Sequence, residues 1–439
     1  MRHDRHLEPA AEHPHALNKK PASRKTAAPR SDAASTGRWN ALFIAVVALA
    51  ASIAGIANDF AQDDLHLIQE NVRIQDLANL RDIVASSFWP PPYSQDLYRP
   101  VTSLLLALEF TLGAGAPVVY RVVSYLMYAA VCVAVFSLAR RLLAESVAFA
   151  VVLLFAAHPV HVEAVALGVG QSELIVCGLA VLSVILYIDA RRANRLTWRR
   201  WTSLAALFVA AALAKEQGFV IPALLLSAEV VLGGSGVVRA RSLAPGYLLL
   251  ACSGALALSL RYAVLGELSG TFTAEALVGA GIRERFFTML AIVPQWLRLL
   301  LWPAHLQSDY SPQELVASHA FGLHEAFGAL LVLLALLGAW VSRRRAPVVA
   351  LGVLWTAIAL APVSNVVAPT AILVAERTLM LPSIGALFAL GALAQWGMEA
   401  WPRATQRFRT ELRGAVALLV AAGVVRSAER QRVWRNDAF

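Results

Sequence analysis

Long apolar runs recur along the whole chain, and short stretches that contain charged residues or proline separate them. A transmembrane α-helix needs about 20 consecutive apolar residues to cross the hydrocarbon core of a bilayer. Measured against that length, the pattern predicts eleven membrane-spanning helices. We expect them at 39–57, 117–139, 145–166, 171–190, 200–214, 217–233, 243–264, 322–341, 346–364, 379–398 and 412–426.

One of these apolar stretches, 200–233, is interrupted by Lys215-Glu216. As a single helix it would be roughly 50 Å long, well beyond the thickness of a bilayer core. We therefore predict two short spans with the charged pair at the turn between them. The alternative is one long helix that buries the pair.

Two long connections, about 58–116 and 265–321, carry most of the remaining sequence. Within the first, segment 98–115 places leucines at helical spacing, which predicts an amphipathic helix lying in the membrane interface. Within the second, 285–301 has a similar pattern and is expected to be interfacial or re-entrant. Both connections thus combine polar loops with a helix that does not span.

Composition supports a membrane environment. Hydrophobic residues make up 58% of the chain and charged residues only 15%, whereas about a quarter of the residues in soluble domains are charged. This balance excludes an ordinary soluble enzyme. The net charge of +9 does not indicate nucleic acid as a partner, because the basic residues lie between apolar runs instead of on one face of a folded domain. The fold class is therefore expected to be an all-α polytopic membrane protein.

The distribution of basic residues predicts the orientation. Of 38 Lys and Arg residues, 24 lie in the N-terminal tail and in alternate short connections, and such an excess marks the cytoplasmic side. With eleven spans, the C-terminus and both long connections are then external. The expected organisation is a disordered basic cytoplasmic tail at 1–38, a transmembrane catalytic domain at 39–426 and a short external C-terminal tail at 427–439.

The first external loop holds the most direct signal for chemistry. Between residues 58 and 99 there are seven acids and three bases, unlike the basic cytoplasmic connections. Asp63 and Asp64 follow the first span by a few residues, at the membrane surface. A carboxylate beside low-dielectric protein can have its basicity tuned to accept a proton from a hydroxyl. Both are candidates for a general base, with a slight preference for Asp64.

A second polar group closes the third span with His158, His161 and Glu163. Two histidines three residues apart plus a carboxylate could ligate zinc, but Pro159 disturbs the turn and no further ligand has a recognised spacing. We favour a polar network bordering a cavity, because ionisable groups at membrane helices usually face protein or water. No metal or other cofactor is expected to be required, although a divalent cation remains the alternative.

Three cations stand on the external side against the positive-inside trend: Arg99, Lys215 and Arg377. Cations retained there favour an anionic ligand, and arginine suits phosphate oxygens through its planar fork of donors. We therefore predict that these residues bind a phosphate. The acids Glu173, Glu216 and Glu376 are expected to complete the cavity network with the histidines and Glu163.

Seven sequence blocks occur in order along the chain: Asp63-Asp64 with Asn71, Tyr98-Arg99-Pro100, HPVHVEAV at 158–165, GQSEL at 170–174, Lys215-Glu216, ERTLMLPS at 376–383 and the segment from Arg426 to Trp434. Taken together, these blocks resemble the transmembrane and tetratricopeptide-repeat-containing O-mannosyltransferases and their bacterial relatives, within the GT-C class of glycosyltransferases. The sequence departs from the family pattern at Gln171, where arginine is frequent, and at Thr378 and Met380, where tyrosine is frequent. The C-terminal repeats do not follow before Phe439.

The resemblance implies an inverting glycosyltransferase with a GT-C-like fold. It would move a sugar, expected to be mannose, from a polyprenyl-phosphate donor to an acceptor hydroxyl, expected to be a protein Ser or Thr, at the external face. Bacterial inner (plasma) membrane is the expected location. If the chain ends naturally at Phe439, acceptor recognition falls to the external loops or to a separate protein.

The competing interpretation is a polytopic transporter, or a flippase for lipid-linked substrates, without transferase activity. Transporters often contain inverted repeats with broken helices in matching halves. No such symmetry is visible in this sequence, and the candidate charges gather in external loops. These observations favour the enzyme.

Overall fold

A computed structural model describes residues 30–93, 96–233, 240–268, 273–310, 314–366, 368–400 and 405–436, and within these ranges the regular structure is entirely helical. The chain divides into Met1–Trp39 and Asn40–Phe439, and the packing reported below lies within the second unit. The main helices are α1 (Arg30–Ser52), α2 (Leu80–Ala85), α3 (Pro100–Gly113), α4 (Pro117–Leu142), α5 (Glu145–Ala156), α6 (Val162–Ala166), α7 (Gln171–Arg192), α8 (Trp198–Ala214), α9 (Ile221–Leu232), α10 (Ala240–Leu265), α11 (Ile282–Leu301), α12 (Leu323–Ser342), α13 (Pro347–Leu360), α14 (Met380–Ala400) and α15 (Thr405–Gln431).

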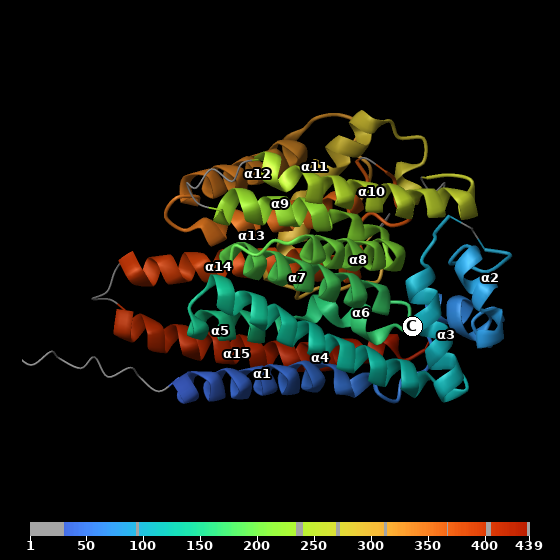
Figure 1. Cartoon of the computed structure of the whole chain (residues 1–439), viewed down its shortest axis with the longest axis horizontal. Helices are drawn as coiled ribbons and strands as arrows, with labels where there is room; N and C mark the ends of the chain where they lie inside the picture. The colour runs from blue at the N-terminus through green and yellow to red at the C-terminus, as the bar shows by residue number, and fades with distance from the viewer. Residues whose placement is uncertain are drawn as a thin grey trace, which may run out of the picture. The chain divides into compact units, whose positions relative to one another are not determined.

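The long helices pack alongside one another around a shared apolar core (Figure 1). α13 and α14 pack very closely, because a Cβ on Gly352 would lie 2.4 Å from the carbonyl oxygen of Gly385. Small residues at such a crossing let helix backbones approach closely, which is how helices pack where lipid removes the hydrophobic driving force. On α12, by contrast, Leu333, Leu337 and Trp340 are exposed, as expected for a surface that faces lipid.

Six helices in the described part of the chain are long and apolar enough to cross a membrane, and a seventh span results if the bent pair α5 and Pro159–Ala166 is counted as one. The predicted fold class, an all-α polytopic membrane protein, is confirmed. The eleven predicted spans correspond in position to α1, α4, α5 with α6, α7, α8, α9, α10, α12, α13, α14 and α15. Several of these helices are short, so the count of eleven stays a prediction.

The predicted break at Lys215-Glu216 is confirmed. α8 ends at Ala214, Lys215 adopts an extended conformation, and a 3-10 turn, η5 (Glu216–Val220), leads into α9. Gly218 makes this turn possible because a Cβ there would lie 2.3 Å from the carbonyl carbon of Ala211. The two charged residues therefore lie at the end of a helix instead of inside one.

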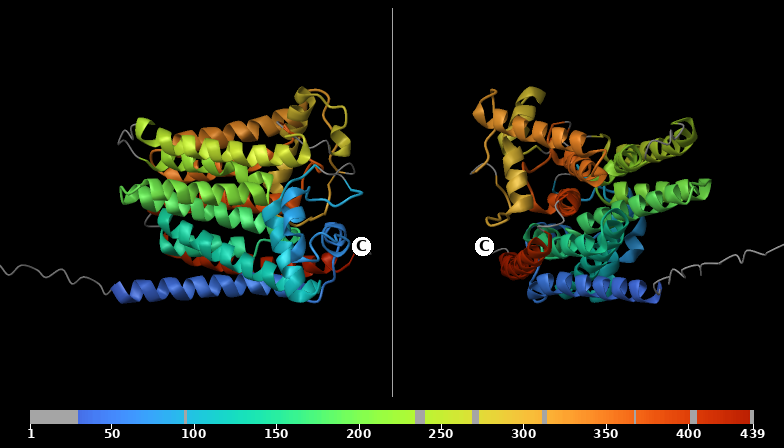
Figure 2. Two further views of the ribbon diagram at one scale, coloured as in Figure 1. Left: turned by 45° about the vertical axis from the view of Figure 1, so that its right-hand side comes forward. Right: turned by 90° about the vertical axis from the view of Figure 1, so that its left-hand side faces the viewer.

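The two expected non-spanning helices are also present, as α3 and α11. Figure 2 shows that α2, α3 and the segments between α10 and α12 lie toward the same end of the long helices. The first loop has an apolar core that includes Phe60, Leu67 and Phe88 and is shared with residues of α3, α4 and α6. It is therefore a folded element that holds the residues after α1 in fixed positions.

Both segments that were predicted to be tails contain folded residues in the structure. α1 begins at Arg30, so residues 30–38 are helical, as the helix-forming alanines there allow; residues 1–29 lie outside the described part. At the other end, α15 continues to Gln431, and Trp434 is buried in the core of the first loop. Burying this indole stabilises the end of the chain against the loop. Residues 427–436 thus belong to the folded domain instead of forming a tail.

Candidate active site

The predicted polar residues come from helix ends and breaks that meet at one end of the long helices. The segment after α1, the turn η4 (Pro159–His161) with α6, η5, and the turn η8 (Glu376–Leu379) contribute them. α6 and η4 both contact η8, while η5 packs against α8. Helix breaks expose backbone groups and allow charged side chains to converge, which continuous apolar helices would prevent.

Asp64 is completely buried and fully engaged. Its carboxylate accepts hydrogen bonds from the backbone N–H groups of Gly168 (2.8 Å) and Val169 (2.9 Å) and pairs with the Arg121 guanidinium at 3.5 Å. Burial raises the pKa of the Asp64 carboxyl, and Arg121 together with the two N–H donors opposes that shift. These contacts tie the first loop to the segment before α7, so Asp64 acts as a structural anchor.

Asp63, its neighbour, points to a different environment. Its carboxylate lies 3.3 Å from the guanidinium of Arg377, and the two side chains keep 31% and 20% of their surface exposed. Arg377 is held in turn by buried Glu163, which pairs with the guanidinium at 3.4 Å and accepts the Arg377 backbone N–H at 2.8 Å. The structure therefore presents an accessible carboxylate beside an accessible, firmly oriented arginine.

The other two predicted cations occupy neighbouring ion pairs. The Lys215 ammonium pairs with buried Glu173 and interacts electrostatically with both Arg99 and Arg377. Because like charges interact strongly only at short range, the three cations share one region of the molecule. Their mutual repulsion is an unfavourable arrangement that an anionic ligand would relieve.

Glu216 holds Arg99 in place. Its carboxylate accepts from Arg99 at 2.7 Å and from Arg261 of α10 at 3.0 Å. Burial alone would raise the pKa of Glu216, but the two guanidinium groups lower it to about 2. Glu216 is therefore ionised throughout the physiological range, and it does not pair with the adjacent Lys215.

The predicted histidine pair is part of a hydrogen-bond network. The ring nitrogens of His161 face the Tyr128 hydroxyl at 2.9 Å and the Ser383 hydroxyl at 3.0 Å. His158 contacts the carbonyl of Leu300 at 3.1 Å through one nitrogen and the N–H of Val160 at 3.3 Å through the other. No group of three ligand side chains suited to a metal ion occurs in the described ranges.

Glu376, the last predicted member of the network, connects three elements. It accepts from the Tyr310 hydroxyl at 2.7 Å and from the Gln307 N–H at 2.5 Å, and it pairs with Arg430 of α15 at 3.4 Å. These contacts position η8, and with it Arg377, against the second loop and the C-terminal helix.

Four charged residues that contribute to these ion pairs and hydrogen bonds were not identified from the sequence: Glu109, Arg121, Arg261 and Arg430. Arg121 also donates to the carbonyls of Asp59 (2.6 Å) and Ala166, which fixes the loop that carries Asp63. Glu109 accepts from Gln171 at 2.7 Å. The sequence does contain a signal for them, because each is a charged residue inside an apolar or amphipathic helical segment. Burying such a charge is costly unless it is paired.

Comparison with known proteins confirms the resemblance. No family model matches the chain. Among curated proteins, the chain is 25% identical to a protein O-mannosyl-transferase of Caenorhabditis elegans over 81% of its own length and 51% of that protein. It is 26% identical to TMTC3 of Mus musculus (79% and 40%) and 27% identical to TMTC4 of Homo sapiens (91% and 60%), both protein O-mannosyl-transferases. The chain thus spans about half the length of these relatives.

Solved structures show the same architecture at low sequence identity. The oligosaccharyltransferase AglB of Archaeoglobus fulgidus, in complex with an inhibitory peptide and a dolichol-phosphate, superposes with a TM-score of 0.52 at 12% identity, covering 91% of this chain and 56% of that one. The apo form of the Archaeoglobus fulgidus oligosaccharyltransferase gives 0.54 at 13% identity, covering 90% and 56%. The GT-C-like fold class is therefore confirmed, and the chain is an integral membrane protein.

Proposed function

We propose that the chain is a membrane glycosyltransferase that moves a sugar from a polyprenyl-phosphate donor to a hydroxyl group of a protein acceptor. The relatives are named as protein O-mannosyl-transferases, which supports this reaction class. The observation that carries the mechanism is the 3.3 Å contact between the accessible Asp63 carboxylate and the Arg377 guanidinium. In the proposed mechanism, Asp63 is the proton acceptor and the neighbouring Arg377 binds the phosphate of the donor.

In this proposal Asp63 is the general base, in place of the initial preference for Asp64. A base has to reach the proton that it removes. Asp64 is fully buried, and its carboxylate is occupied by Arg121 and two backbone N–H groups. Asp63 keeps a partly exposed carboxylate and one ionic partner.

The reaction is a single displacement. The acceptor hydroxyl oxygen forms a bond to the anomeric carbon while the bond from that carbon to the phosphate oxygen breaks and its electron pair stays on the phosphate. The hydroxyl proton passes to Asp63, and the anomeric configuration inverts. Arg377, with Arg99 and Lys215 nearby, stabilises the negative charge that grows on the departing phosphate.

The ion pair also suggests how donor binding prepares the base. A phosphate that engages Arg377 competes with Asp63 for the same guanidinium donors. Once that contact weakens, the Asp63 carboxylate is a better proton acceptor and lies next to the sugar. Glu163 keeps Arg377 oriented during this exchange because it binds both the guanidinium and the backbone N–H.

We further propose that the sugar is mannose, that the acceptor residues are Ser or Thr, and that the site faces the exterior of a bacterial plasma membrane. The proposed reaction requires no metal, because arginine and lysine supply the positive charge that stabilises the departing phosphate. The histidine network of His158 and His161 is assigned to shaping the cavity.

The test is transfer by purified protein in nanodiscs, given a polyprenyl-phosphate mannose and a Ser/Thr peptide. The proposal predicts a glycopeptide of inverted configuration, formed at a similar rate with and without EDTA. Arg377→Lys keeps the charge but loses the planar fork, so it should raise the donor KM. Absence of transfer to any peptide, or complete loss of transfer in EDTA with an unchanged Arg377→Lys variant, would contradict the proposal.

A further inference from the structure

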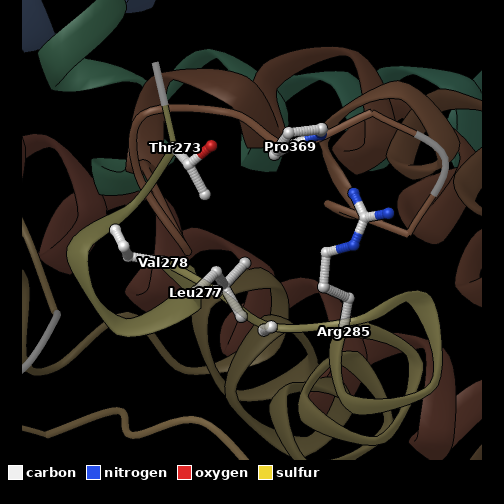
Figure 3. Close-up of a pocket in the computed structure, with 7 residues that line it drawn as sticks. Thr273, Leu277, Val278, Arg285 and Pro369 are labelled. Atoms are coloured by element: carbon white, nitrogen blue, oxygen red, sulfur yellow. The ribbon is translucent and has the colours of Figure 1, made fainter. Parts of the chain in front are cut away.

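Two adjoining hollows lie between the second loop and residues 369–372, away from the ion pairs of the candidate active site, and Figure 3 shows the larger one. The larger, with a volume of about 600 Å³, is bounded by residues 277–280, Thr273, Arg285 and Pro369. The smaller, of about 350 Å³, shares Thr273 and Val278 with it and extends along Ala371 and Ile372. Together they form a cleft between two backbone segments, 273–280 and 368–372, which we call the loop cleft.

The walls of the loop cleft are fixed to each other and to the protein core. The backbone N–H of Ala274 donates to the carbonyl of Thr370 at 2.9 Å, which joins the two segments. Leu277 is buried in an apolar cluster that also contains Val160 and Leu379, from the two turns beside the candidate active site. The cleft is therefore built on the same support as Glu163 and Arg377.

A single cation reaches into the larger hollow. Arg285, from the first turn of α11, projects toward Pro369 on the opposite wall (Figure 3). Its Nε is buried and has no hydrogen-bond partner, and no ion pair of Arg285 is found among the described residues. Because the Arg285 side chain lines the hollow, an anionic group there would pair with the terminal nitrogens of its guanidinium.

The smaller hollow has the opposite charge. Glu275 and Asp309 line it, together with Ala371 and Ile372. A lipid phosphate would meet these carboxylates, whereas a peptide can present an acidic side chain to Arg285 and keep neutral or basic residues beside the acids.

The loop cleft is within reach of the reacting groups. Ile372 in its wall precedes Arg377 by five residues, so their Cα atoms are at most about 18 Å apart even along a fully extended chain. A bound peptide covers such a distance with a similar number of residues. One segment of acceptor can therefore occupy the cleft while a neighbouring hydroxyl reaches Asp63.

Resting on the proposed transferase function, we infer that the loop cleft binds the acceptor polypeptide and that Arg285 selects segments with an acidic side chain a few residues from the modified Ser or Thr. The contact is a charge-assisted hydrogen bond, whose loss weakens binding by about 10- to 100-fold. Arg285 thereby acts as a specificity residue and takes no part in the bond-making step.

The experiment measures binding of fluorescent Ser/Thr peptides by the purified full chain in nanodiscs, without donor. Paired peptides carry either Asp or Lys at one position, which is moved stepwise along the sequence. The wild type should bind the Asp peptide at least about tenfold more tightly at the best position, and Arg285→Glu should reverse that preference. Arg285→Lys, which keeps the charge, should retain the preference for Asp.

The matched control is Arg283→Glu, from the same helical turn, because Arg283 is exposed and its guanidinium lies over the Phe287 ring. It should bind both peptides as the wild type does.

Equal binding of both peptides by the wild type, or the same change in both Glu variants, would overturn the inference. An Arg285→Glu variant with unchanged peptide preference and a raised donor KM would also overturn it, in favour of a lipid phosphate. Because binding needs no donor, Arg285-dependent peptide selection without any sugar transfer would retain the cleft and refute the transferase.

Discussion

At the scale of single residues, two adjacent acids differ in their accessibility because different groups surround them. Asp63 and Asp64 are neighbours in sequence, yet one is accessible beside Arg377 and the other is sealed against Arg121 and two N–H groups. Their proximity to a span end could be predicted from the sequence. Which of them faces a substrate could not, because that depends on the packing of segment 166–169, more than a hundred residues away.

The buried carboxyl of Glu109 leads to a prediction about pH. Burial raises the pKa of Glu109 to about 8; the hydrogen bond from the Gln171 amide opposes this shift, and the negative charge of Asp64 adds to it. The folded protein therefore binds a proton that the unfolded chain releases near its ordinary pKa of 4.5. The resulting stabilisation is complete below about 4.5 and is lost as the pH rises through about 8.

Glu109→Gln removes this titration while keeping a neutral side chain of the same shape. The unfolding temperature of the wild type should fall between pH 6 and pH 9, and that of Glu109→Gln should be flatter. Glu70→Gln is the control, because the His66 hydrogen bond lowers the pKa of exposed Glu70, so it stays ionised over this range. Parallel pH profiles of the wild type and Glu109→Gln would refute the account of this residue.

At the scale of elements, the chemistry depends on where helices stop. The charged pair at 215–216 marked the break between α8 and α9 in the sequence because an apolar run of that length could not form one span. The partners of that pair were not visible, since Lys215 reaches α7 and Glu216 reaches Arg99 and Arg261. Sequence separation in each case exceeds forty residues.

The tight turn after α8 can be tested through its glycine. A Cβ at position 218 would lie 2.3 Å from the Ala211 backbone, so Gly218→Ala should force the turn apart and destabilise the protein by about 1–3 kcal/mol. It should also lower the transfer rate by displacing Glu216 and with it Arg99. Gly338→Ala on α12, where a Cβ meets nothing within 4 Å, should leave both quantities unchanged. Thermal unfolding and initial rates measure the two effects, and equal behaviour of both variants would contradict this role for the turn.

At the scale of the whole molecule, the polytopic all-helical architecture could be predicted because apolar length is a strong signal. The extent of the C-terminal helix could not, since the burial of Trp434 against the first loop depends on contacts between the two ends of the domain. The same holds for Glu376, whose links to Tyr310 and Arg430 bring three distant segments together.

The membrane topology is predicted from the distribution of basic residues. A reporter fused after Asn71 should behave as external, and one fused after Arg345 as cytoplasmic. This arrangement puts Asp63 and Arg377 on the outer face with the second loop. An external reporter after Arg345 would show that the predicted orientation, or the number of spans before it, is wrong.

The central claim is that Asp63 takes the proton from the acceptor while Arg377 holds the phosphate of the donor. The most direct measurement is the initial rate of sugar transfer by Asp63→Asn at saturating donor, beside Asp82→Asn, an exposed acid of the same loop. The account predicts a rate lower by about 10²- to 10⁴-fold for Asp63→Asn with an unchanged unfolding temperature, and a normal rate for Asp82→Asn. A near-normal rate for Asp63→Asn would contradict it and place the base elsewhere.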